Sequence, residues 1–320
     1  MKFAGHDDAW REWRAALAGP RMHHGWIIAG RRGTGKASFA LAAARELVAE
    51  AGIPQPPGDH PDILVLSALP ASADDERKRD EGKPYQLKRN ISVDQIRGMQ
   101  QRLTTRPTLG SRRAIIIDPA DDLEKGASNA LLKSLEEPPA GSYFLLVTHR
   151  IGRLLPTIRS RCRVVQFPAV GEGDIDAILQ RDAPEADQAM RAAAIAAAGG
   201  SPGAAIDFVN HDLGRLHQLM QRISDAGDGD FALRGALAEA MGTRPDRKRQ
   251  LAAIDLARAV VAGRMAHTSR AAIPALTHAH GELVRLAAQA PTYNFDAGLL
   301  VMEIGTLLAS LSPPRDTAHG

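Results

Sequence analysis

The chain is poor in cysteine and in aromatic residues. Its 320 residues include one cysteine, Cys162, and aromatic side chains make up 4% of the composition. A single thiol cannot close an internal disulfide, and it excludes metal sites built from several thiolates. The low aromatic content argues against a surface on which single-stranded nucleic acid stacks its bases.

Long hydrophobic runs and an excess of one charge are also missing. No apolar stretch approaches the ~20 residues of a membrane-spanning helix, and residues 1–14 carry charges where a secretory signal is apolar. A cytoplasmic location is therefore expected. The 40 basic residues stand against 37 acidic ones, and the resulting net charge of +3 permits contact with nucleic acid without requiring it.

Strand and helix patterns alternate through the first half of the chain. Short apolar runs predict buried strands, and amphipathic or alanine-rich segments between them predict helices. The predicted strands are 25–29, 63–66, 114–117 and 143–148, and the predicted helices are 10–17, 37–50, 93–103 and 128–137. This alternation indicates an α/β domain with a parallel, doubly wound sheet. Residues 67–90 lack such spacing and are expected to form a solvated, mobile insertion.

The strand signal is absent after residue 170. Short helical patterns at 174–180 and 185–198 end at Gly199-Gly200 and suggest a small helical domain. Alanine- and leucine-rich segments from 213 to 311 predict a third, all-helical domain. The predicted domains are therefore 1–167, 168–211 and 212–320.

Residues 30–36, GRRGTGK, have the spacing of a phosphate-binding loop. They follow a predicted strand and open a predicted helix, which is the context in which this motif binds phosphate. The glycines let backbone N–H groups turn toward the phosphates, and Lys36 adds a positive charge. The next residue is Ala37, whose methyl group cannot ligate the Mg²⁺ that a Ser or Thr hydroxyl holds in a working site. The alternative is a glycine-rich turn without a ligand.

An acidic residue at the end of a buried strand forms the second half of such a site. Asp118 follows the strand 114–117 in this way, although an aspartate there is also common for structural reasons. Hydrolysis further needs a carboxylate that orients or deprotonates water, but the neighbour is Pro119, and Asp121 is expected to be a turn or capping residue. The residues expected to line the phosphate site are Gly30, Gly33, Thr34, Gly35, Lys36, Asp118 and Thr148.

Three strings further along the chain carry a family resemblance. They are NALLKSLEEPP at 129–139, YFLLVT at 143–148 and LLPTIRSRC at 154–162. Together they resemble the clamp-loader branch of the AAA+ ATPases. The resemblance is dense from residue 26 to 166 and weak around 199–205, and it rests beyond that on helicity and length alone. It implies an α/β AAA+ P-loop domain with a parallel sheet, a small helical lid domain and an all-α C-terminal collar.

The chain is similar to clamp-loader subunits that have lost their hydrolytic parts. Ala37, Pro119 and Gly203 stand where motor subunits carry a metal-binding hydroxyl, a water-activating carboxylate and a lid arginine. The resemblance implies that Arg161, in the Ser-Arg-Cys string, acts as an arginine finger on the γ-phosphate held by a neighbouring subunit. Such a subunit donates catalysis without hydrolysing ATP by itself. The alternative for Arg161 is an ordinary surface arginine in an ion pair.

Partners are implied by the same resemblance. They are gamma/tau-type motor subunits and a delta subunit in a hetero-pentamer of the DNA polymerase III assembly, with the sliding clamp and primer-template DNA reached through that assembly. No cofactor is expected to be required, although the degenerate loop keeps groups that suit a residual nucleotide, phosphate or sulfate. Residues 51–60, where related subunits carry a four-cysteine zinc module, contain no cysteine, so no zinc and no other metal is expected.

Two other functions stay open at this point. One is an active AAA+ ATPase of the motor type, which uses Lys36 and Asp118 with a non-standard metal arrangement. The other is a nucleotide-binding regulatory module outside replication. Turnover by the chain alone favours the first, and failure to form a complex with a clamp-loader motor subunit favours the second.

Overall fold

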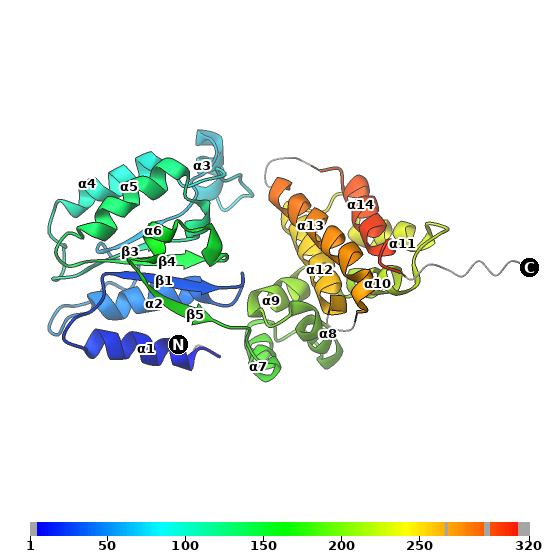
Figure 1. Cartoon of the computed structure of the whole chain (residues 1–320), viewed down its shortest axis with the longest axis horizontal. Coiled ribbons are helices and arrows are strands. Elements are labelled where there is room, and N and C mark those ends of the chain that lie inside the picture. The colour runs from blue at the N-terminus through cyan, green and yellow to red at the C-terminus, as the bar shows by residue number, and fades with distance from the viewer. Residues whose placement is uncertain (1–4, 266–267, 291–294, 313–320) are drawn as a thin grey trace, which may run out of the picture. The chain divides into compact units, whose positions relative to one another are not determined.

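The chain divides into two compact units, Met1–Val170 and Gly171–Gly320. The computed structural model describes residues 5–265, 268–290 and 295–312 of these units (Figure 1). The outer ends of the predicted first and third domains, 1–4 and 313–320, lie outside the described residues.

A five-stranded parallel sheet forms the centre of the first unit, with the strand order β2-β3-β4-β1-β5. Four strands lie where the sequence predicts them, and β5 is an additional one. Because β5 lies at the edge of the sheet and alternates exposed with buried residues, it has no continuous apolar run to reveal it. The strands are β1 (Gly25–Gly30), β2 (Ile63–Leu66), β3 (Arg113–Ile117), β4 (Ser142–Thr148) and β5 (Arg163–Phe167).

Helices cover both faces of this sheet (Figure 1). Alternate strand residues point to opposite faces, so Ile27 and Ile115 pack in one core cluster while Trp26 and Ile116 pack in the other. The first cluster includes residues of α4 and α5, and the second includes residues of α1 and α2. These helices are α1 (Asp7–Ala18), α2 (Lys36–Val48), α4 (Val93–Leu103) and α5 (Lys125–Glu136). Burial on both faces explains why the central strands are almost wholly apolar.

The insertion at 67–90 has structure of its own. It contains the helix α3 (Ala73–Asp80), whose N-cap Ser72 accepts a hydrogen bond from the backbone N–H of Asp75 at 3.1 Å. An antiparallel bridge joins Pro70 to Leu87, and the Asp75 carboxylate accepts the N–H of Gln86 at 3.0 Å. Most of the segment is exposed, as predicted, and it also has local structure, while its mobility stays a prediction. Caps and turn hydrogen bonds order it, and apolar spacing does not report on these.

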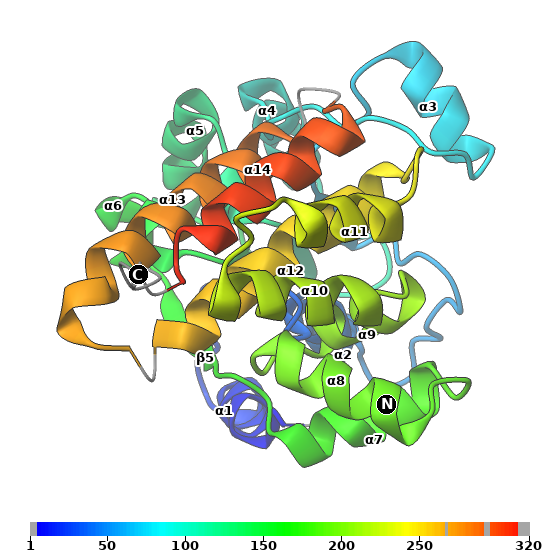
Figure 2. The same ribbon diagram turned by 90° about the vertical axis from the view of Figure 1, so that its right-hand side faces the viewer.

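The second unit consists of helices throughout its described residues (Figures 1 and 2). Gly199, with φ +55°, ends α8, as the sequence predicts. Helices α7 to α9 pack on one another, and α10 packs on α11, α12 and α14. The division into 168–211 and 212–320 stays a prediction. The helices are α7 (Glu172–Asp182), α8 (Gln188–Ala198), α9 (Pro202–Asn210), α10 (Gly214–Ala226), α11 (Ala232–Met241), α12 (Arg247–Met265), α13 (Ile273–Gln289) and α14 (Ala297–Ala309).

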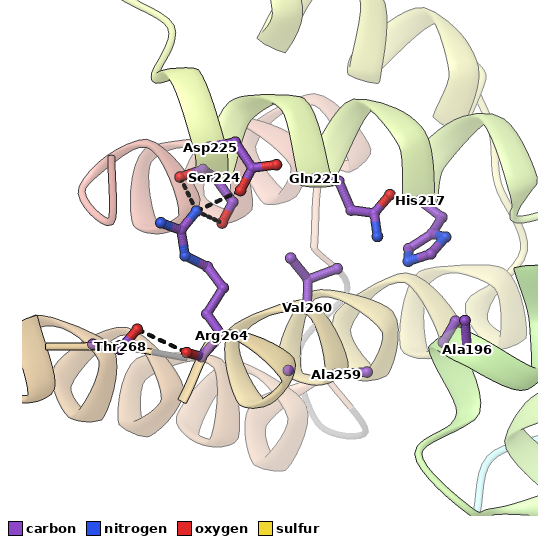
Figure 3. Close-up of a pocket in the computed structure, with 11 residues that line it drawn as sticks. Ala196, His217, Gln221, Ser224, Asp225, Ala259, Val260, Arg264 and Thr268 are labelled. Atoms are coloured by element: carbon purple, nitrogen blue, oxygen red, sulfur yellow. Dashed lines mark hydrogen bonds and ion pairs between the residues drawn. The ribbon is translucent and has the colours of Figure 1, made fainter. Parts of the chain in front are cut away.

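A cavity of about 470 Å³ is lined by residues of α8, α10 and α12 in the second unit (Figure 3). Arg264 borders it, and its guanidinium donates to the hydroxyl of Ser224 at 2.8 Å and to the carboxylate of Asp225 at 2.7 Å. The charge of Arg264 is therefore already paired within the wall of the cavity.

None of the helices in the described ranges combines the length and the hydropathy that crossing a bilayer requires.

Four short helical elements complete the described secondary structure. They are α6 (Pro156–Arg159) and the 3₁₀ turns η1 (Ala120–Asp122) and η2 (Ile151–Arg153) in the first unit, with a third 3₁₀ turn, η3 (Arg270–Ala272), in the second.

Candidate functional site

The predicted phosphate loop joins the end of β1 to the start of α2. Gly33 and Gly35 have φ of +76° and +87°, a region that favours glycine because a Cβ is strained there. A Cβ on Gly30 would lie 2.3 Å from the carbonyl oxygen of Phe167 in β5. The glycines of the motif are thus required by the backbone path and by close packing, as the loop interpretation predicts.

Lys36 is the buried cation of this loop, with 3% of its surface exposed. Its ammonium group donates to the carbonyl oxygen of Arg31, and the hydroxyl of Thr34 donates to the same oxygen at 2.8 Å. Burial lowers the pKa of Lys36 to about 8, against the opposing effect of Asp118 and Asp121. Near pH 7 the ammonium therefore keeps most of its positive charge, as phosphate binding requires.

Asp118 directly follows β3, and its backbone N–H donates to the carbonyl oxygen of Leu66 at 2.9 Å. Burial raises the pKa of its carboxyl group, Lys36 opposes this rise, and the charge of Asp121 adds to it. Asp118 is therefore close enough to Lys36 for the two charges to influence each other, which agrees with the predicted pairing of strand end and loop.

Asp121 lies in η1 and holds the end of β4. Its carboxylate accepts hydrogen bonds from the hydroxyl of Thr148 at 3.0 Å and from the backbone N–H groups of His149 at 2.6 Å and Arg150 at 3.1 Å. The prediction that Asp121 is a turn residue agrees with its place in η1, but it does not include these contacts with the end of β4. Local rules consider only adjacent backbone, whereas these partners are 27 to 29 residues away in the sequence.

His149 is a site residue that the sequence analysis does not identify. Its Nδ1 atom is buried and has no hydrogen-bond partner within the part of the chain that the structure describes. Burial lowers the pKa of its imidazole to about 4, Lys36 adds to this effect, and Asp121 opposes it. The imidazole is therefore neutral near pH 7. Its place directly after a buried strand is the one sequence signal that marks it.

The structure brings the predicted loop residues, Asp118 and Thr148 to one edge of the sheet. The loop follows β1, Asp118 follows β3, and Thr148 ends β4, and these strands are neighbours and parallel. Carboxyl ends of parallel strands are the usual place for ligands in such sheets. Backbone N–H groups, a helix N-terminus and Lys36 suit an anion there, whereas Ala37 and Pro119 provide neither a Mg²⁺ ligand nor a proton acceptor.

Arg161 lies at the opposite end of the same sheet, where the strands begin. It precedes β5, whose residue Arg163 pairs with Trp26 near the start of β1, whereas Phe167 pairs with Gly30 at the start of the loop. At about 3.3 Å per strand residue, the two ends of β1 are separated by roughly 16 Å. The Arg161 side chain is 35% exposed and forms an ion pair with Glu136 at 2.8 Å. An arginine side chain does not span that distance, so Arg161 does not serve the loop of its own chain.

Cys162, next to Arg161, is partly buried and packs against the core. Burial raises the pKa of its thiol to about 12, so the thiolate is scarce near pH 7. Among the described residues, no cluster of three or more His, Cys, Asp or Glu side chains is placed to hold a metal ion.

Comparison with known proteins places this geometry in a family. A family model described as DNA polymerase III, delta subunit matches residues 5–171, slightly more than half of the chain. The DNA polymerase III subunit delta' of Pseudomonas aeruginosa is 32% identical over 199 residues, which cover 58% of this chain and 56% of that protein. The subunit delta' of Escherichia coli is 30% identical over 214 residues, which cover 62% of this chain and 58% of that protein.

The chain thus spans little more than half the length of these curated relatives. A solved structure of a DNA polymerase III gamma subunit-related protein from Thermotoga maritima has 19% identity and a TM-score of 0.45, and the superposition covers 94% of this chain and 98% of that chain. The family match, together with the loop and the parallel sheet, shows that the chain belongs to the DNA polymerase III delta-subunit family and is similar to its clamp-loader subunits named delta'.

Proposed function

We propose that the chain is a non-hydrolysing, delta-prime-like subunit of the DNA polymerase III clamp loader. In this role it helps to place a sliding clamp on primed DNA, and Arg161 acts at the ATP site of a neighbouring motor subunit. A guanidinium presented from outside neutralises the charge that develops on the transferred phosphoryl group, an effect worth about 10³–10⁵ in rate.

The placement of Arg161 carries this proposal. Arg161 is partly exposed and lies about 16 Å along the sheet from the loop of its own chain. A phosphate that it contacts must therefore belong to another molecule. The residues of its own loop also support a subunit that does not hydrolyse ATP itself, because Ala37 and Pro119 supply neither the hydroxyl nor the carboxylate that a hydrolytic site uses.

The partners in this proposal are gamma/tau-type motor subunits and a delta subunit in a hetero-pentamer. The sliding clamp and primer-template DNA are contacted through that assembly, in the cytoplasm. The loop of this chain needs no cofactor for such a role. Its N–H groups and Lys36 suit a nucleotide, a phosphate or a sulfate that fills the site without turnover.

A motor-type ATPase is the second candidate. Lys36, Asp118 and Thr148 lie at one edge of the sheet, as a hydrolytic site requires, and the neutral imidazole of His149 is a proton acceptor beside them. This candidate still needs a metal arrangement without a hydroxyl at position 37.

Steady-state ATP hydrolysis separates the two candidates. The purified chain is assayed alone, with and without primed DNA, beside Lys36→Ala. We expect no turnover above the Lys36→Ala background. Turnover typical of AAA+ motors that Lys36→Ala abolishes would instead establish a motor.

The trans role of Arg161 is tested in the assembly reconstituted with a gamma-type motor subunit and a delta subunit. We expect Arg161→Ala to reduce hydrolysis at the neighbouring site by about 10³-fold or more. An unchanged rate in an intact assembly would contradict the proposal.

A further inference from the structure

The guanidinium of Arg161 is engaged within its own chain. Its Nη2 lies 2.8 Å from a carboxylate oxygen of Glu136, and its Nη1 donates to the carbonyl oxygen of Thr157 at 3.0 Å and to the hydroxyl of Ser160 at 3.3 Å. Both terminal nitrogens, the groups that bind phosphate oxygens in a forked contact, therefore already have partners.

Glu136 has no evident role in the stability of its own helix. It is the last residue of α5, where the negative end of the helix dipole disfavours a carboxylate. Its neighbour Glu137 is also exposed, but none of the ion pairs found in the described ranges involves it. Of the two adjacent glutamates, only Glu136 is paired with the candidate finger.

The backbones that carry this pair are firmly held. Leu135, 1% exposed, packs in the core, and its carbonyl oxygen lies 2.9 Å from Nε2 of His24. Ile158 of α6 is also 1% exposed and belongs to the same core cluster. Glu136 and Arg161 therefore meet from fixed positions, and only their side chains have to move when the pair opens.

We infer that Glu136 is a positioning residue. Its ion pair holds Arg161 within its own chain, here called the parked state, while Arg161 is not in contact with the ATP site of a neighbouring subunit, here called the engaged state. Engagement exchanges the Glu136 carboxylate for a phosphate oxygen of the neighbouring ATP site. This inference rests on the proposed function and adds a step to it, because the parked and engaged states of Arg161 exclude each other. Both side chains are partly exposed, at 35% and 48%, so the pair is weak and opens readily.

The parked state has a kinetic consequence that can be measured. The ratio kcat/KM compares the free assembly with the transition state, and the Glu136–Arg161 pair exists only in the free assembly. Removing the pair therefore raises kcat/KM for ATP by the strength of the pair. Exposed ion pairs correspond to an increase of about 1.4- to 5-fold.

The experiment measures kcat/KM for ATP in the reconstituted assembly that contains a gamma-type motor subunit and a delta subunit. Glu136→Gln is compared with the wild type and with the matched control Glu137→Gln. At low salt we expect Glu136→Gln to increase kcat/KM by about 1.4- to 5-fold. This increase becomes smaller at high salt, because ions screen the pair in the wild type. Glu137→Gln is expected to leave kcat/KM unchanged. A gain of rate does not arise from misfolding, so the expected result is specific to release of Arg161.

A decrease in kcat/KM, or a value equal to that of Glu137→Gln, would overturn the parked state. The double variant Glu136→Gln/Arg161→Ala must behave like Arg161→Ala, because without the guanidinium the carboxylate has nothing to hold. If Arg161→Ala itself has no effect, the proposed function fails. If Arg161→Ala lowers the rate but Glu136→Gln does not raise it, the parked state alone fails.

Discussion

Asp121 holds the end of β4, and its removal is expected to destabilise the first unit. The carboxylate accepts the hydroxyl of Thr148 and the N–H groups of His149 and Arg150. Thr148 is fully buried and has no access to water, so loss of the acceptor for its hydroxyl group destabilises the fold by about 1–3 kcal/mol. The N–H groups of His149 and Arg150 are less buried and regain part of their hydrogen bonding from solvent. We expect Asp121→Ala to lower the free energy of unfolding by about 2–4 kcal/mol.

Tryptophan fluorescence during urea unfolding measures this loss in the correct part of the chain. The three tryptophans, Trp10, Trp13 and Trp26, all lie in the first unit, so the signal does not report on the second. Asp122→Ala is the matched control. Burial raises the pKa of the Asp122 carboxyl, Asp121 adds to this rise, and Arg153 and Arg32 oppose it without cancelling it, so we expect this carboxylate to add little to stability.

We expect Asp122→Ala to leave the stability unchanged or to raise it slightly. A stability loss that is no larger for Asp121→Ala than for Asp122→Ala would refute the assignment of Asp121 as the anchor of β4. Asp121→Ala also lowers the pKa of Lys36 further below about 8, because the charge of Asp121 raises that pKa in the wild type.

Further outcomes are expected at three residues, Asp62, Gly30 and Cys162. Asp62→Ala leaves Arg113 buried without its carboxylate, so urea unfolding shows a loss of about 3–5 kcal/mol. Burial opposes the ionisation of Asp62, but backbone N–H groups and Arg113 outweigh this effect and lower the pKa of Asp62. The stabilisation by Asp62 is therefore complete above the ordinary pKa range of a carboxyl group, and it is lost as the pH falls through the lowered pKa. An acid titration in which stability does not fall in this way would contradict the prediction. Gly30→Ala places a Cβ 2.3 Å from the Phe167 carbonyl oxygen, and thermal unfolding is expected to show a loss of about 1–3 kcal/mol, whereas an unchanged midpoint would mean that the strand ends move apart freely. Cys162 is expected to react with iodoacetamide at pH 8 far more slowly than a free thiol, because its pKa is about 12; equal rates would show that the thiol is not held in the core.

Several features of the fold and the site are written in the local sequence. Continuous apolar runs mark β1, β3 and β4 because strands buried on both faces need apolar residues at every position. The outer strand β2 also has an apolar run, although its Val65 is exposed. The phosphate loop is readable because positive φ values and close approach to Phe167 require glycine at fixed places. The absence of a hydroxyl at Ala37 and of a carboxylate at Pro119 is equally direct, since it is a property of one residue type.

Other features depend on residues far apart in the sequence, and the tertiary structure alone decides them. The strand β5 is half exposed, so its pairing with β1 leaves no distinctive pattern. The role of Asp121 depends on hydrogen-bond partners 27 to 29 residues away, and the role of Glu136 depends on Arg161, 25 positions further along the chain. The buried, unpartnered nitrogen of His149 is likewise set by its surroundings.

The separation of Arg161 from the loop of its own chain shows the same division most clearly. The sequence by itself identifies both the loop and the Ser-Arg-Cys string, because each depends on short-range spacing. Only the parallel pairing of β1 with β5 places them at opposite ends of one sheet. Strand direction is a property of the folded chain, and this direction places Arg161 away from the predicted phosphate loop of its own chain.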